Sequence, residues 1–173
     1  IWYGGWNRDL ISSNEQAILE DYLDGDCGTA DNTCSDNRNI IVMTQMADWF
    51  RSRNTNFLNT YMHADVIYSC TVSGTSNPMK GVSGSIFEGK EFSTADASLH
   101  YLSRPCGVKT TGPEAVGAFT YDLRKGDAAG YEFHAVQFPS ETYAGTQTHK
   151  SFFLGEEIGC LLYTSDAADD SGC

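Results

Sequence analysis

The side chains that could do chemistry in this sequence are spread along the chain rather than grouped. The histidines stand at four positions: His63, His100, His134 and His149. No two of them lie within four residues of each other, which is the spacing by which one helix or loop commonly offers two ligands to zinc. We therefore expect no metal centre built on histidine. His134 falls in a strand-like stretch, where its ring shares a face with Val136 and Phe138, and a packed role is favoured over a catalytic one.

Acidic residues between positions 24 and 36 could bind calcium in an extracellular protein. The carboxylates are those of Asp24, Asp26, Asp31 and Asp36. Calcium loops repeat their ligands in the cadence D-x-D-x-D-G, which this segment lacks. We favour a solvated loop over a calcium site, and we expect no cofactor in the chain.

Cysteine usage indicates an oxidising compartment. Without Cys160 and Cys173, which belong to the unusual final segment discussed below, the remaining cysteines are Cys27, Cys34, Cys70 and Cys106. An even number in an acidic, lysine-poor chain favours disulfides and secretion. A Cys27–Cys34 bridge would close a short polar loop and leave Cys70–Cys106 as the second bridge, although four cysteines allow three pairings. A zinc site is disfavoured because the sequence has no C-x-x-C pair.

Charge and composition exclude several classes of protein. The chain has 173 residues, 40% of them hydrophobic, and a formal net charge of −12. This is enough for one domain with a real core. An anionic surface repels phosphate backbones, so we expect no nucleic-acid partner. No apolar run approaches the roughly 20 residues that span a bilayer, so we expect no membrane span.

The final segment has an unusual sequence. Residues Cys160 to Asp170 read C-L-L-Y-T-S-D-A-A-D-D, which resembles the translated end of a transposase-type sequencing adapter. We therefore expect the native domain to cover residues 1–159, and we treat residues 160–173 as a non-native tail that should be left out of fold arguments.

Local patterns predict alternating strands and helices. Ser12 with Glu15 has the spacing of a capping box, and Gly25 suits the end of the helix that follows. We predict further elements at these positions: a buried strand at 40–43, a helix at about 47–61, strands at 117–122 and 131–138, and a final helix from Thr146. The stretch 64–116 is predicted to form loops and short strands. Buried strands that alternate with helices favour a doubly wound α/β sheet.

Several scattered positions together resemble a known family. The opening Trp2-x-Gly4-Gly5 is followed by Leu10-Ile11-Ser12, Glu15, Leu19 and the run Tyr22-Leu23-Asp24-Gly25, and the chain later reads Gln137-Phe138-Pro139-x-Glu141. This pattern is similar to class I glutamine amidotransferase-like domains attached to secreted bacterial proteins, including peptidases. The resemblance implies a flavodoxin-like, doubly wound, mostly parallel sheet. It would be truncated at both ends, with the first strand and helix upstream of Ile1.

The same resemblance implies a glutaminase site that has lost its chemistry. The family places a cysteine nucleophile on a sharp turn after a buried strand, where this chain has Thr44 and Gln45. A β-branched residue suits such a turn poorly. The family's histidine base is replaced by Pro139, which has no titratable group, while Glu141 keeps the orienting carboxylate. These degenerate positions predict that the chain is not a glutaminase.

Three functions remain open from the sequence. The leading expectation is a non-catalytic accessory or binding domain of a larger secreted bacterial protein, which would contact other domains of that protein and a small-molecule or glycan ligand. Its candidate binding residues are Gly4, Gly5, Trp6 and Gln45. One alternative is a divergent secreted hydrolase that uses Thr44, Glu141 and a histidine. The other is a carbohydrate-binding module, in which Trp6 offers a stacking platform beside the turn.

Overall fold

The structure is a computed structural model that describes residues 1–3, 11–25, 38–44, 47–66, 79–92, 106–120, 130–145 and 149–155. The elements in these ranges are β1 (Trp2–Tyr3), α1 (Ser13–Asp24), β2 (Arg38–Met43), α2 (Ala47–Thr60), β3 (Ala64–Val66), β4 (Met79–Lys80), β5 (Glu91–Phe92), β6 (Val108–Thr110), β7 (Val116–Thr120), β8 (Phe133–Phe138) and β9 (His149–Leu154).

The main sheet is mixed, so the predicted flavodoxin-like, doubly wound parallel sheet is wrong. Its strands follow the order β1-β2-β9-β8-β6-β3, and β7 also pairs with β8. The pairs β1–β2 and β2–β9 are parallel, whereas β3–β6, β6–β8, β7–β8 and β8–β9 are antiparallel. For β8 and β9, a short connection explains the antiparallel pairing. A parallel pair needs a crossover of a dozen or more residues, and only residues 139–148 join β8 to β9.

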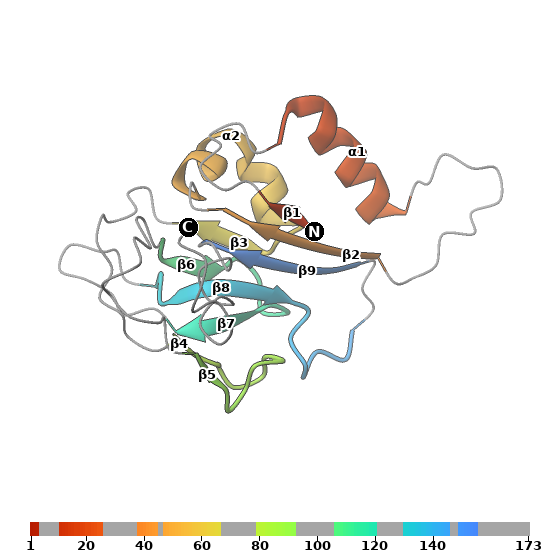
Figure 1. The fold of residues 1–173 in the computed structure, drawn as a ribbon. Helices are drawn as coiled ribbons and strands as arrows, with labels where there is room; N and C mark the ends of the chain where they lie inside the picture. Colours follow the sequence, from red (N-terminus) through yellow and green to blue (C-terminus); the bar gives the residue numbers. More distant parts are fainter. Residues whose placement is uncertain are drawn as a thin grey trace, which may run out of the picture.

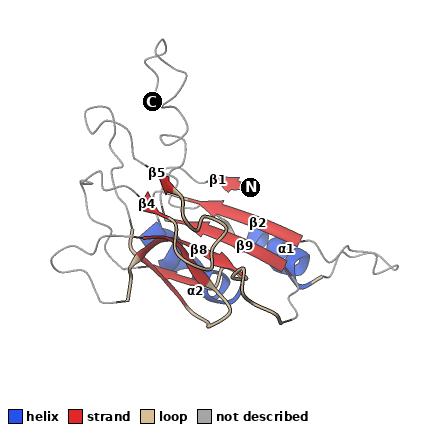
Figure 2. Cartoon of the chain, turned by 90° about the horizontal axis from the view of Figure 1, so that it is seen from below, coloured by secondary structure: helices blue, strands red, loops and turns tan. Residues whose placement is uncertain are grey.

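Both described helices lie on one face of the sheet (Figures 1 and 2). A doubly wound sheet would carry helices on both faces. Here the segment 79–92, with the small β4–β5 sheet, lies on the other side, where Phe87 packs against Phe119 and Phe152. The sheet therefore has a helix-covered face and a face covered by a loop and a short hairpin.

The first helix begins and ends as its sequence predicts. The Ser12 backbone N–H donates to the Glu15 carboxylate over 2.8 Å, and the Glu15 N–H donates to the Ser12 hydroxyl over 3.3 Å. Gly25 ends the helix with a φ of 96°, a left-handed conformation that glycine adopts without a steric penalty. The predicted capping box and C-terminal glycine are confirmed.

The predicted final helix from Thr146 is wrong, because its apolar residues form β9. This strand lies between β2 and β8, where Val42 faces Phe153 and Phe153 faces Val136. Phe153 belongs to the helix-side core, whereas Leu154 belongs to the core on the opposite face. A short aromatic and aliphatic run fits a strand that is buried on both faces.

Packing between the helices and the sheet forms the larger core. Phe50 of α2 stacks on Phe153 of β9 with 6.0 Å between ring centroids, and Phe57 contacts Phe50 edge-on. The side-chain amide of Asn54 donates to Gln16 of α1 over 2.6 Å.

No helix in the described ranges is long and apolar enough to span a membrane.

Candidate functional site

The length of the strands separates the two parts of the site that the family resemblance predicts. Thr44 follows β2, and its N–H donates to the Leu154 carbonyl over 3.1 Å, which extends the parallel ladder. Ser151 of β9 faces both Ile40 and Phe138, so Pro139 lies near the start of β2. Five residues of strand separate the two levels, about 16 Å at roughly 3.3 Å per residue. Thr44 and Pro139 therefore lie at opposite ends of the strands.

Glu141 has a structural partner, Gln137, close to the end of β8. The side-chain amide of Gln137 donates to the Glu141 carboxylate over 2.9 Å and to the Pro139 carbonyl over 3.0 Å. The Gln137 amide oxygen in turn accepts the N–H of Ile86 over 3.0 Å. The Glu141 N–H donates to the Gly84 carbonyl over 2.8 Å. Glu141 thus helps to hold the 79–92 segment against β8.

Thr44 does not adopt the conformation of a nucleophile-bearing turn. It is fully buried. Among the described residues other than glycine, a positive φ occurs at His63, where it is 50°, and not at Thr44.

The predicted binding residues Gly4, Gly5, Trp6 and Gln45 lie outside the described residues, as do Cys27, Cys34 and Cys70. Cys106 is buried and disulfide-bonded. Both predicted pairings stay predictions.

His63 and Glu114 form a pair that the sequence did not predict. His63 Nδ1 lies 2.9 Å from Glu114 Oε1. A carboxylate accepts hydrogen bonds, so Nδ1 carries the proton and Nε2 of the neutral ring is an acceptor. The structure gives Nε2 no hydrogen-bond partner among the described residues. The His63 side chain is 16% exposed and that of Glu114 is 25% exposed, so solvent reaches both.

Packing fixes the position of the His63 ring. It stacks on Phe138 at the end of β8, with 3.7 Å between ring centroids and 13° between the planes. The His63 carbonyl accepts the Thr111 N–H over 2.9 Å, which holds the backbone in its left-handed conformation. Such strained conformations persist where surrounding contacts determine them, and they occur often at functional sites.

A second histidine lies beside this pair. The ring centroid of His149, at the start of β9, lies 6.2 Å from that of His63. Burial lowers the pKa of both histidines below the ordinary value. For His63, Glu114 opposes this effect and His149 reinforces it. For His149, the Tyr61 carbonyl and Asp24 oppose it. Both rings are therefore neutral at neutral pH.

The residues after β8 complete one surface, which we call the His63 surface: His63, Glu114, Ser140, Thr142 and Tyr143. The Ser140 N–H donates to the Glu114 carbonyl over 2.8 Å, and the Tyr143 N–H donates to the Ser140 carbonyl over 3.1 Å. The hydroxyls of Ser140 and Thr142 lie 3.3 Å apart. Tyr143 is 39% exposed. The surface therefore combines a carboxylate, a neutral imidazole, two hydroxyls and an aromatic ring.

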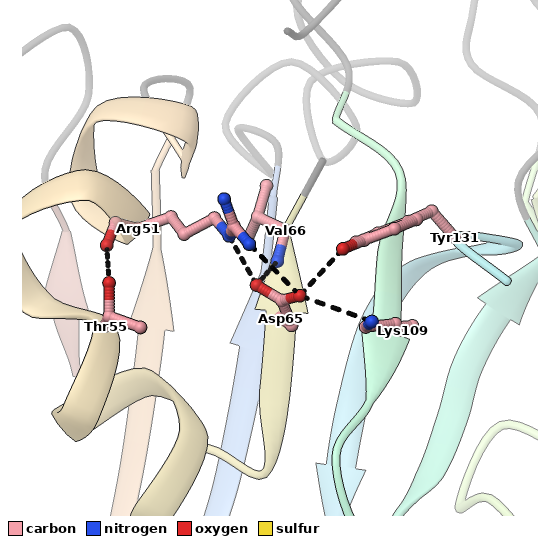
Figure 3. A network of polar contacts seen from close by, with 6 residues as sticks. All are labelled: Arg51, Thr55, Asp65, Val66, Lys109 and Tyr131. Carbon is pink, nitrogen blue, oxygen red and sulfur yellow. Dashed lines mark hydrogen bonds and ion pairs between the residues drawn. The ribbon is translucent and has the colours of Figure 1, made fainter. Parts of the chain in front are cut away.

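A separate polar network surrounds Asp65 of β3 (Figure 3). Its carboxylate accepts hydrogen bonds from Arg51 Nε, from the Tyr131 hydroxyl over 2.7 Å and from the Val66 N–H over 3.0 Å. Lys109 Nζ lies 3.4 Å from the same group. Burial alone would raise the pKa of Asp65, but the bonds from Arg51 and Tyr131 outweigh it and lower the pKa. The carboxylate is saturated with partners, which favours a structural role.

The comparisons with known proteins provide no family for this chain. No protein-family model, no curated protein and no solved structure matches it. Functional inference therefore rests on the geometry of the described residues. Among these, no group of three or more His, Cys, Asp or Glu side chains is placed to hold a metal ion.

Sequence reasoning missed the His63 surface because its residues are distant in the chain. His63 follows α2, Glu114 lies in the β6–β7 turn and Tyr143 follows β8. A weak signal was present in Ser140 to Gly145, where hydroxyl, acidic and aromatic side chains follow a buried strand. The edge at which this segment meets His63 depends on the antiparallel β8–β9 pairing, which the sequence did not indicate.

Proposed function

We propose that this chain is a non-catalytic accessory domain of a larger secreted protein, and that it acts by binding. The separation of Thr44 from Pro139 carries this proposal. Nucleophilic catalysis needs the nucleophile and its base within hydrogen-bond reach, with a third group to orient the base. Thr44 lies about 16 Å along the strands from Pro139, which holds the position of the family's base, and this distance prevents the two positions from serving one reacting group.

The contacts of Glu141 give independent support to this proposal. In an active glutaminase of the family that the sequence resembles, the carboxylate at the position of Glu141 would orient a histidine at the position of Pro139. Here it accepts a hydrogen bond from Gln137, a residue that also binds Ile86. The resemblance to that family is then limited to the opening of the chain, where β1 and β2 are parallel and α1 connects them. The binding role would fall to another surface.

The proposal is tested by measuring hydrolysis with the purified chain. We expect no release of ammonia from glutamine above the buffer rate, and no cleavage of p-nitrophenyl esters that depends on Thr44. Thr44→Ala and Glu141→Gln serve as matched variants, since either would abolish a true activity at this site. Ammonia release that both substitutions abolish would overturn the proposal.

A further inference from the structure

We propose that the His63 surface binds a neutral glycan. This inference rests on the proposed function, because it supplies the ligand class of a binding domain. Sugars without charge offer two kinds of contact: apolar faces of C–H groups, which pack on aromatic rings, and hydroxyls, which both donate and accept hydrogen bonds. The His63 surface offers a partner for each.

The aromatic platform is Tyr143. A Cβ atom at Gly145 would lie 2.3 Å from both Cζ and Oη of Tyr143, so the ring lies directly against the backbone of Gly145. Packing against Phe138, with 6.4 Å between centroids, supports the ring from another side. The residue is still 39% exposed. Tyrosine suits such a position because it offers an apolar ring together with a polar hydroxyl.

The polar groups lie on the same segment as this ring and on the Glu114 turn to which Ser140 bonds. The Glu114 carboxylate has acceptor capacity beyond its bond to His63. Nε2 of His63 is an acceptor for a sugar hydroxyl, because Glu114 fixes the proton on Nδ1. The hydroxyls of Ser140 and Thr142 both donate and accept. A few such groups around an aromatic contact are the usual means by which a binding site fixes the orientation of its ligand.

The surface is organised before any ligand arrives. Backbone hydrogen bonds link Ser140 to Glu114 and Tyr143 to Ser140, and the His63 ring is held by Phe138. Rigid contacts lose little conformational entropy on binding, which favours affinity from a small contact area.

Charge selects neutral sugars over acidic ones. The chain has a formal net charge of −12, and Glu114 lies within the surface. A uronate or sulfate would meet like charge. Because both neighbouring histidines are neutral at neutral pH, they add no positive charge to offset it.

The experiment uses soluble neutral polysaccharides as probes: a β-glucan, a galactomannan and an arabinoxylan, with polygalacturonate as the acidic arm. Binding is measured by affinity electrophoresis and titration calorimetry. We expect at least one neutral polysaccharide to bind and polygalacturonate not to bind. Tyr143→Ala should weaken binding about tenfold or more, and Glu114→Gln should also weaken it.

Tyr22→Ala is the matched control. Tyr22 is exposed to a similar extent, 41%, but lies on α1, so its loss should leave binding unchanged. Equal urea midpoints for the variants exclude unfolding as the cause. Absence of binding to all three neutral polysaccharides, or binding that Tyr143→Ala leaves intact, overturns the glycan inference alone. Cleavage of a bound polysaccharide, seen as new reducing ends, overturns the non-catalytic function instead.

Discussion

The Nε2 hydrogen of His149 is donated to the backbone carbonyl of Tyr61 over 2.9 Å, which joins the start of β9 to the end of α2. The ring is buried, and burial lowers the pKa of His149 below its ordinary value of 6.5. The unfolded chain therefore takes up a proton at higher pH than the folded chain. The folded state should lose stability as pH falls below about 6.5 towards the folded-state pKa. Urea unfolding at pH 7.5, 6.5 and 5.5 measures this loss.

Two substitutions test the cause of this acid sensitivity. His149→Gln removes the titrating group, so the decline in unfolding free energy between pH 7.5 and 5.5 should become shallower. Glu114→Gln removes a carboxylate that raises the pKa of His63, so the decline should become steeper. A pH dependence that neither variant alters would show that other groups determine it.

Asp65 should be one of the residues on which stability depends most. Asp65→Ala leaves the Arg51 guanidinium without this carboxylate, in a position where the Arg51 side chain is only 12% exposed. Breaking a buried ion pair by removing one partner costs about 3–5 kcal/mol. Lys109→Ala is the control, because the Lys109 side chain is 40% exposed and its ion pair is worth less than about 1 kcal/mol. Similar urea midpoints for the two variants would contradict the structural role of Asp65.

Gly117 is required for the packing of β7 against β8. A Cβ atom at this position would lie 2.1 Å from Cδ1 of Phe133, a residue of the neighbouring strand β8. Gly117→Ala should lower the unfolding free energy by about 1–3 kcal/mol, the usual cost of overpacking. In a Phe133→Ala background the clash is absent, so the same substitution should cost much less. A double-mutant cycle measures that difference, and purely additive effects would refute the clash.

The elements that could be predicted from sequence are those whose signals are local. The Ser12 and Glu15 capping box and the Gly25 terminus fixed the limits of α1 within one segment. The continuous apolar run from Ile40 to Met43 predicted most of β2. In each case the residues that determine the structure are neighbours in the chain.

Strand pairing could not be predicted, because it depends on contacts between distant residues. The run Phe152 to Leu154 fits a helix or a buried strand equally well by periodicity. Its position between β2 and β8 decides the question. The order and direction of the strands then determine at which end of the strands each loop lies. The alternative that pairs Thr44 with Glu141 depends on this order, and so does the position of His63 beside Glu114.

The Gln137 side chain distinguishes a structural Glu141 from a catalytic remnant. Gln137 is 7% exposed and bonds to Ile86, Pro139 and Glu141. Gln137→Ala should lower the unfolding free energy by about 1–3 kcal/mol, because it removes a buried amide that bonds to Ile86, Pro139 and Glu141. Glu141→Gln keeps a side-chain oxygen that can accept from Gln137, so its urea midpoint should stay close to that of the parent chain. A large loss from Glu141→Gln, with little loss from Gln137→Ala, would show that the charge of Glu141 matters for a reason other than holding the 79–92 segment.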